Sequence, residues 1–224
     1  MAQQADTERY ICSLCAKAQK RPAIWATIAL MHELLKIPAT VSEHMVGMIR
    51  VKWWQEQLHY IATNDHQARE DHPILLALKH TPLSKEACDA VCEAIMQQCG
   101  ENNLTLNEAQ HALGACYQLL SYAAGEAEHQ TIYNALGQEA ALIATIRVNT
   151  LKSEWSAAST IMYDTLRERE SVTISKNARF ATALSLHNAL WKSRIIKAKK
   201  RDDPSMLKHI PFFALRIMWA RIIY

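Results

Sequence analysis

The sequence predicts an all-α protein, and three observations support this prediction. Glycine and proline are scarce, with 5 and 6 in 224 residues, whereas sheet proteins need these residues in their many turns. No proline occurs from residue 83 to residue 203, which is typical of stacked helices because an internal proline costs about 3 kcal/mol. Half of the residues are apolar, so the chain can bury a core and wholesale disorder is not expected.

Apolar periodicity, caps and turn residues divide the chain into ten expected helices. Their ranges are 6–20, 22–36, 41–63, 72–80, 84–99, 105–123, 126–150, 154–169, 174–200 and 205–223. No linker, repeat or low-complexity tract separates them, which predicts a single domain over residues 1–224.

Start signals and apolar stripes justify several of these helices in turn. Pro22 suits the first turn of the second helix, where its missing N–H is harmless. Ser84 is a suitable N-cap for the fifth helix, and Thr105 with Glu108 has the spacing of a capping box for the sixth. Two helices carry an apolar stripe, formed by Val51, Trp54, Leu58 and Ile61 in the third and by Phe180, Leu184, Leu190, Trp191 and Ile195 in the ninth.

The net charge of +3 is small but unevenly distributed. Residues 192–221 hold nine Lys or Arg against two Asp, which gives +7 and leaves −4 on the rest of the chain. A basic C-terminal segment, 192–224, on a mildly acidic body indicates an anionic membrane or an assembly partner and not nucleic acid. The candidate membrane- or partner-binding residues are Lys197, Lys199, Lys200 and Arg201.

The aromatic stretch 210–224 and the cysteines bear on membrane contact and compartment. The stretch suits an interfacial helix or a terminal helix that covers the core, and we favour the second. We find no secretory signal and no apolar run long enough to span a bilayer, so the six cysteines are expected to be reduced in a cytoplasmic or matrix-like compartment.

No motif of the sequence identifies a metal or catalytic site. Cys12-x-x-Cys15 and Cys88-x3-Cys92 lack the further ligands of a zinc site, so these thiols are expected to pack as small hydrophobes. The carboxylates at 86, 89, 93, 164 and 168 are interpreted as solvated helix faces. Nucleophile-elbow, metalloprotease, Walker and dinucleotide patterns are missing from the sequence. We therefore predict no catalytic residue and no metal ligand.

Several segments are similar, in order, to those of one known family. They are Asp6–Tyr10 (DTERY), Arg21–Leu34, Val41–Leu58 with its Trp53-Trp54 pair, His72–Leu75 (HPIL), Gly137–Arg147 (GQEAALIATIR) and, more loosely, Met162–Leu166 and Pro211–Trp219. These segments resemble the squalene/phytoene synthase family, and the pair of tryptophans is the most specific of them. The resemblance implies an isoprenoid synthase-like helical bundle around a central cavity.

The resemblance also implies where catalysis should occur and what is missing there. Active members join two prenyl diphosphates head to head and bind Mg²⁺ through two aspartate-rich motifs on facing helices. The corresponding places here, 35–40 (LKIPAT) and 148–152 (VNTLK), contain no aspartate. We therefore expect no cofactor, and Mg²⁺ only if the chain is active. Arg21, Arg50 and Arg147 match basic family positions, which makes them candidates for binding a substrate or phosphate group, with ordinary surface pairing as the alternative.

Three functional hypotheses follow. The favoured one is a non-catalytic member that acts as an assembly factor or binds a lipid or isoprenoid, because the chain resembles a short, motif-poor branch that includes a mitochondrial complex I assembly factor associated with the inner membrane. The second is an active prenyl transferase with relocated carboxylates, drawn from Glu33, Glu43, Glu126, Glu128 and Glu139. The third is a helical module that binds a membrane or protein through residues 192–224 and is unrelated to isoprenoids.

Overall fold

The computed structural model describes residues 2–41, 43–63, 71–99, 105–153, 157–169, 174 and 178–208. Within these residues it contains ten α-helices, three short 3-10 helices and no strand, which confirms the all-α prediction. The α-helices are α1 Ala2–Ala5, α2 Thr7–Ser13, α3 Arg21–Thr40, α4 His44–Ala62, α5 Pro73–Leu78, α6 Lys85–Gln98, α7 Leu106–Ala124, α8 Gln130–Ser153, α9 Ala157–Glu168 and α10 Arg179–Arg201. The 3-10 helices are η1 Ala18–Lys20, η2 Ala127–His129 and η3 Pro204–Leu207.

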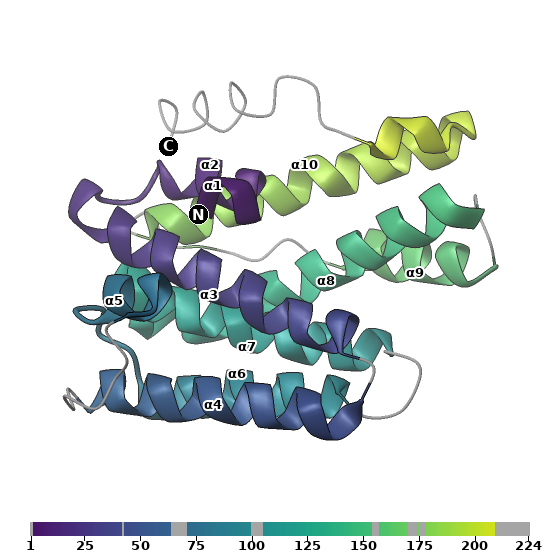
Figure 1. Ribbon diagram of the computed structural model, residues 1–224. Coiled ribbons are helices and arrows are strands. Elements are labelled where there is room, and N and C mark those ends of the chain that lie inside the picture. Colours follow the sequence, from purple (N-terminus) through teal and green to yellow (C-terminus); the bar gives the residue numbers. More distant parts are fainter. Residues whose placement is uncertain are drawn as a thin grey trace.

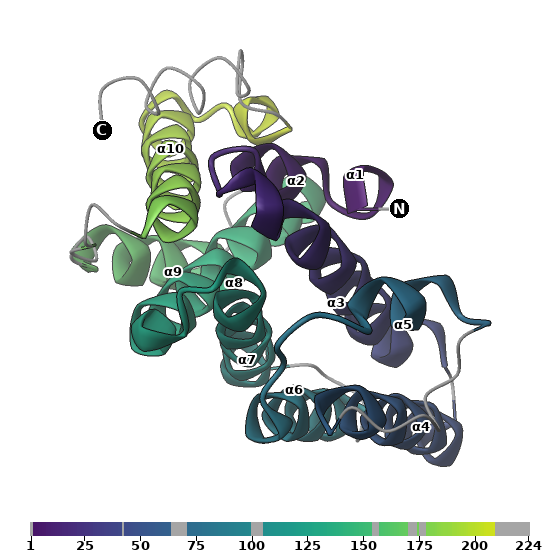
Figure 2. The ribbon, with the colours of Figure 1, turned by 90° about the vertical axis from the view of Figure 1, so that its left-hand side faces the viewer.

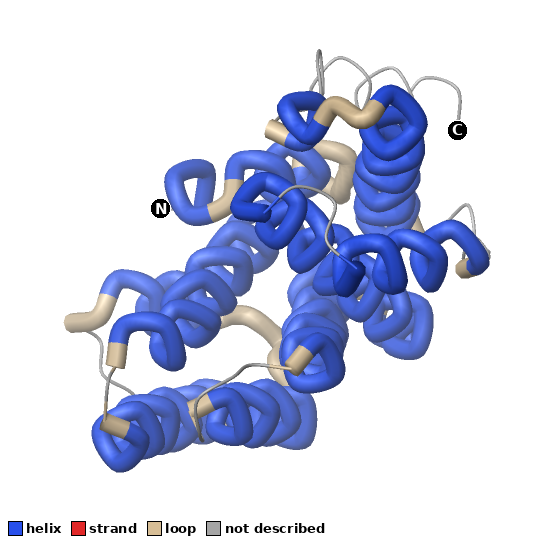
Figure 3. The backbone as a smooth tube through the Cα atoms, turned by 90° about the vertical axis from the view of Figure 1, so that its right-hand side faces the viewer, coloured by secondary structure: helices blue, strands red, loops and turns tan. Residues whose placement is uncertain are grey.

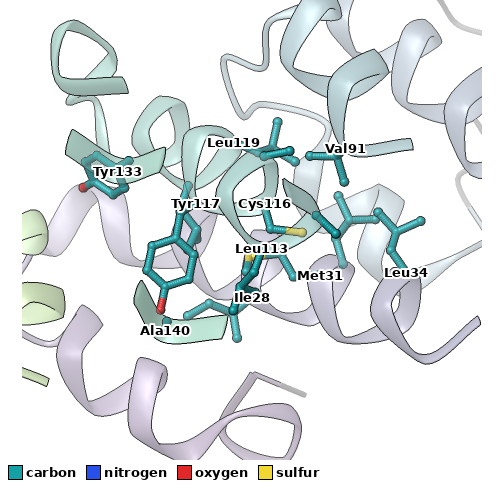
Figure 4. Packing of buried hydrophobic residues seen from close by; sticks show 14 of the residues in the cluster. Ile28, Met31, Leu34, Val91, Leu113, Cys116, Tyr117, Leu119, Tyr133 and Ala140 are labelled. Atoms are coloured by element: carbon teal, nitrogen blue, oxygen red, sulfur yellow. The ribbon is translucent and has the colours of Figure 1, made fainter. Parts of the chain in front are cut away.

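Helix α7 lies at the centre of the bundle. Helices α3, α6 and α8 pack against it, α4 lies beside α6, and α10 packs on α8 and α2 at the opposite side of the molecule (Figures 1 and 2). Most of α7 is buried, and its apolar side chains meet those of α3 and α6 in one core (Figure 4). Leu113 and Cys116 of α7 lie there beside Met31 of α3.

The backbones of α7 and α8 approach each other closely at two glycines. A Cβ atom on Gly137 would lie 2.8 Å from the Cα atom of Gly114 and would overlap the carbonyl oxygen of Leu113. A Cβ atom on Gly114 would lie 2.9 Å from Nδ2 of Asn134. This crossing therefore requires a residue without a side chain on α8.

The predicted caps and stripes are confirmed with one exception. The Ser84 hydroxyl accepts a hydrogen bond from Ala87 N at 3.2 Å, and Thr105 and Glu108 form both bonds of a capping box. The stripe of α4 is buried from Val51 to Ile61. The stripe of α10 is buried as well, except that Leu190 is only partly covered.

Two predicted helices end clearly elsewhere in the structure, and a third lies mostly outside the described residues. The helix expected at 6–20 ends at Ser13, and Arg21 then donates hydrogen bonds to the carbonyls of the turn that follows. The helix expected at 22–36 continues through Pro38 to Thr40, because a proline in the last turn removes a single backbone bond. The helix expected at 205–223 lies mostly outside the described residues, which include only η3 of it.

Candidate functional site

The two places where aspartate-rich motifs were expected lie at the C-terminal ends of α3 and α8. Residues 35–40 form the last turns of α3, and residues 148–152 lie in the last turns of α8. Both helices end on the same side of the bundle, the right-hand side of Figure 1, which faces the viewer in Figure 3. The sequence resemblance thus identifies one end of the bundle, although neither segment supplies a carboxylate there.

Apolar side chains are exposed at this end of the bundle. Val148 and Leu151 of α8 are 49% and 43% exposed, and Ile161 of α9 is 67% exposed. On α4, which begins at this end, Met45 and Ile49 are 67% and 63% exposed. Large apolar side chains in water suit contact with a partner or a membrane better than diphosphate binding.

The five glutamates proposed as relocated ligands do not converge. Glu126 accepts hydrogen bonds from the backbone N–H groups of Phe180 and Ala181 at 3.2 and 3.3 Å, so it caps the N-terminus of α10. The other four are Glu139, which accepts a bond from Asn188 Nδ2, Glu33 beside Lys36, Glu128 beside His129, and Glu43, which is exposed. In the part of the chain that the structure describes, no group of three or more His, Cys, Asp or Glu residues could hold a metal ion.

The three candidate arginines occupy different environments. Arg21 donates to the backbone carbonyls of Leu14 and Ala16 at 2.7 and 3.3 Å and so holds the turn before α3. Arg50 is exposed on α4. Arg21 and Arg147 contact different parts of the chain, since Arg147 pairs with Glu8 of α2 and donates to the carbonyl of Leu207 in η3.

Arg147 is held from three sides in the space between α2, α8 and α10. Its guanidinium carbon lies 3.5 Å from the centre of the Trp191 ring, which is a cation–π contact. Its Nη1 atom is 4.0 Å from Oε2 of Glu8, and its Nε donates to the carbonyl of Leu207 in η3. Burial lowers the pKa of Arg147, although the charges of Glu8 and Asp6 work against this change.

The DTERY segment forms the first anchor between α2 and the core. Asp6 caps α2 by accepting a bond from Arg9 N at 2.9 Å, and its carboxylate also pairs with the Arg9 guanidinium. Arg9 Nε donates to the hydroxyl of Tyr117 on α7 at 2.8 Å. Burial raises the pKa of Tyr117 to about 12, even though Arg9 favours the ionised form. The segment therefore has a structural role in this chain.

Glu8 forms a second anchor, which the sequence reasoning missed. Its Oε2 atom accepts hydrogen bonds from Nε2 of His187 at 2.8 Å and from Nε1 of Trp191 at 2.9 Å. Burial works against the charge of Glu8, but the hydrogen bonds from His187 and Trp191 and the positive charge of Arg147 outweigh it, so the pKa of Glu8 is lowered. The available signal was the stripe of α10, because His187 falls between Leu184 and Trp191 on the buried face.

Asn188 extends this polar network toward α8. Its Nδ2 atom donates to the Leu136 carbonyl at 2.9 Å and to Oε2 of Glu139 at 3.0 Å. Its Oδ1 atom is 3.1 Å from Nδ1 of His187. Because buried polar groups are stable only when hydrogen-bonded, this network fixes how α2, α8 and α10 fit together.

The Trp53-Trp54 pair packs with the histidine of the HPIL segment. The Trp54 and His72 rings meet edge to face with their centres 5.0 Å apart, and Trp53 lies 5.9 Å from His72. His72 is also the N-cap residue of α5. These two segments, which carry much of the family resemblance, therefore join α4 to α5.

The cysteines are all buried and none forms a disulfide, which confirms their packing role. Burial raises the pKa of Cys88 and of Cys116 to about 12. Asp89, expected on a solvated face, instead accepts hydrogen bonds from Gln55 and from His59 Nε2, the latter at 2.6 Å. This contact joins α4 to α6 and was not predictable from spacing within one helix.

The basic end of α10 has mixed environments. Lys197, Lys200 and Arg201 are exposed, whereas the Lys199 ammonium donates to the Thr160 hydroxyl of α9 at 3.3 Å. This contact places the basic end of α10 next to Thr160, and the following residue of α9, Ile161, is exposed. The remainder of the expected basic segment, 209–224, lies outside the described residues.

Comparisons with known proteins agree with this architecture. Residues 2–111 match the squalene/phytoene synthase family model. A 61-residue segment is 31% identical to the human protein NADH dehydrogenase (ubiquinone) complex I, assembly factor 6, and spans 27% of this chain and 18% of the human protein. The family match and the helical bundle confirm the expected isoprenoid synthase-like fold, whereas the central cavity stays a prediction. Among the described residues, no helix is long and apolar enough to cross a membrane.

Proposed function

We propose that this chain, whose residues 2–111 match the squalene/phytoene synthase family model, is a non-catalytic member of that family that acts as an assembly factor for a respiratory complex. One observation carries the proposal, namely that the ends of α3 and α8, where carboxylates were expected, have none and that α8 exposes Val148 and Leu151 there. Without a metal, the diphosphate leaving group loses several kcal/mol of charge stabilisation. The similarity to a human complex I assembly factor supports the assembly role.

Two measurements test this function. Purified protein incubated with Mg²⁺ and farnesyl or geranylgeranyl diphosphate should release no diphosphate, with an active family enzyme as the positive control. Deleting the gene in its own host should lower the amount of assembled NADH dehydrogenase on native gels, and the wild-type gene should restore it. Diphosphate release with formation of a condensed product would contradict the non-catalytic role, and normal assembly in the deletion strain would contradict the assembly role.

A second function, peripheral contact with an anionic membrane, is favoured by the basic end of α10. Lys197, Lys200 and Arg201 are exposed there, and Lys199 joins this end to α9 next to exposed Ile161. A surface that combines basic and apolar side chains is suited to the headgroup region of a cytoplasmic or matrix-facing inner membrane. The same surface, at the C-terminal end of α10, would also suit contact with the apolar tail of a lipid or isoprenoid.

Vesicle sedimentation tests the membrane contact. Each basic residue near an anionic surface contributes about 1 kcal/mol, so Lys197→Glu combined with Lys200→Glu should weaken binding to phosphatidylglycerol vesicles by at least about tenfold. Lys17→Glu with Lys85→Glu reverses two exposed lysines elsewhere and is the matched control. Equal binding by both variants, or equal binding to uncharged phosphatidylcholine vesicles, would refute the proposed contact.

A further inference from the structure

Helix α4 carries apolar side chains on two opposite faces. One face is the buried stripe described above, which packs on the core. The other face carries Met45, Ile49, Trp53 and Tyr60, which we call the outer stripe. Because a helix turns once in 3.6 residues, these positions lie on one side of α4. Met45 and Ile49 are exposed, and the two aromatic residues are partly exposed.

The outer stripe faces away from the rest of the bundle. Helix α4 lies at the edge of the molecule and packs against α3, α5 and α6 with its other sides (Figures 1 and 2). Val46, which is also exposed, widens the outer stripe near the start of the helix. A helix with apolar residues on opposite faces is typical of one that is covered on both, and a continuous exposed apolar patch marks an interaction site.

Charged residues beside the outer stripe indicate what covers it. Lys52 and Glu56 are exposed and lie one turn apart along one border, and exposed Arg50 lies on the other border. An anionic membrane would attract Lys52 but would repel the carboxylate of Glu56. The two signs suit a partner that presents them in the reverse order. A second copy of the chain that runs antiparallel provides this arrangement.

We propose that the outer stripe is the contact surface of an antiparallel homodimer, in which α4 of one copy lies against α4 of the other. With the two-fold axis near Trp53, Lys52 of each copy faces Glu56 of the other, and Ile49 faces Tyr60. A parallel pair would instead place Lys52 opposite Arg50 of the second copy, so the charges select the antiparallel direction. The inference rests on α4 alone and does not depend on the proposed function.

The oligomeric state of the full chain tests the proposal. In analytical ultracentrifugation at about 50 μM, a concentration suited to a small interface, the wild-type protein should have twice the mass of one 25.4 kDa chain. Ile49→Glu places a charge in the outer stripe and should leave a monomer. Ile161→Glu is the matched control, since Ile161 of α9 is 67% exposed and Ile49 is 63% exposed, and this variant should stay dimeric.

Three outcomes of this experiment would overturn the proposal. They are a monomeric wild-type protein, a dimer that persists in Ile49→Glu, and a dimer that Ile161→Glu disrupts equally. A monomeric wild-type protein that binds phosphatidylglycerol vesicles through Ile49 would identify a membrane as the occupant of the outer stripe. Both positions are exposed, so the variants should keep the helical circular dichroism of the wild type.

Charge reversal tests the direction of the helix pair. Glu56→Lys places a lysine opposite Lys52 at two symmetric places, so it should weaken the dimer by about tenfold. Combining it with Lys52→Glu restores opposite charges and should return the dissociation constant to within about threefold of the wild-type value. A protein partner of another sequence or a membrane would not respond in this way. A double variant that is no tighter than Glu56→Lys would refute the antiparallel pairing.

Discussion

Arg9 is a charged residue whose side chain is largely buried. Its guanidinium meets the Asp6 carboxylate and the Tyr117 hydroxyl, and its carbon atom lies 5.2 Å from the centre of the Tyr117 ring. Burial disfavours the charge, but Tyr117 and Asp6 more than compensate, and the pKa of Arg9 is raised. Arg9 belongs to the DTERY segment, which resembles a segment of a catalytic family, but in this chain its positive charge has a structural role.

Replacing Arg9 tests this structural role. Arg9→Met should lower the free energy of unfolding by about 2 kcal/mol, less than the 3–5 kcal/mol of a fully buried pair, because the Arg9 side chain keeps 18% exposure. Urea unfolding measures the change. Arg50→Met removes an exposed arginine of α4 and should change stability by less than about 0.5 kcal/mol. Equal effects of the two variants would contradict the role of Arg9.

The thiols provide a second prediction at the residue scale. Burial raises the pKa of Cys88 and Cys116 to about 12 and shifts the pKa of Cys12, Cys92 and Cys99 upward as well. Because the thiolate is the reactive form, the native protein should react negligibly with a disulfide reagent at pH 8. All six thiols should react after unfolding in urea. Rapid labelling of one or more thiols in the native protein would contradict this expectation.

At the scale of elements, local signals located the starts of α6 and α7 correctly. Ser84 and Thr105 cap their own helices, so the information lies within four residues of the boundary. The end of α2 at Ser13 depends instead on Arg21, which satisfies the carbonyls of the turn from a distance. Pro38 was expected to lie beyond its helix, but a proline near a C-terminus is tolerated when the rest of the helix is packed on a core.

Glu126 caps α10 from outside that helix, which gives a prediction at the element scale. Its carboxylate accepts two backbone N–H bonds at the positive end of the helix and a third from the Tyr133 hydroxyl at 2.8 Å. Glu126→Gln should lower the free energy of unfolding by about 1 kcal/mol, because an uncharged amide has one acceptor oxygen. Glu128→Gln changes an adjacent carboxylate that is 68% exposed and should be nearly neutral in the same urea experiment. A larger loss in the control would contradict the capping role.

At the scale of the whole molecule, the fold class was predictable but the polar network was not. Glycine scarcity and apolar stripes are properties of the chain, and so is the lack of aspartate at 35–40 and 148–152. The Glu8–His187 contact joins residues 179 positions apart, and no periodicity within α2 or α10 specifies that pairing. The assignment of Glu126 and Glu139 to structural bonds likewise required the packing of α8 and α10.

The crossing of α7 and α8 gives a prediction on how the bundle is held together. Gly137→Ala would on helix propensity alone stabilise α8 by about 1 kcal/mol. The new methyl group would, however, overlap the backbone of Leu113 and Gly114, which no rotamer change can relieve, so the two helices must separate. Since overpacking of this kind costs about 1–3 kcal/mol and here involves main-chain atoms, we expect a net loss of about 2 kcal/mol in urea unfolding.

The matched control for this crossing lies on the same helix. Ala144→Gly changes an exposed position of α8 and should cost only the propensity difference of about 1 kcal/mol, without altering how helices pack. Gly137→Ala acts through the contact between the helices, whereas Ala144→Gly acts within α8 alone. Only Gly137→Ala should therefore speed amide exchange in α7 as well as in α8. A stabilised Gly137→Ala variant would mean that α7 and α8 pack farther apart than in the structure. The core around α7 would then be packed less closely as well.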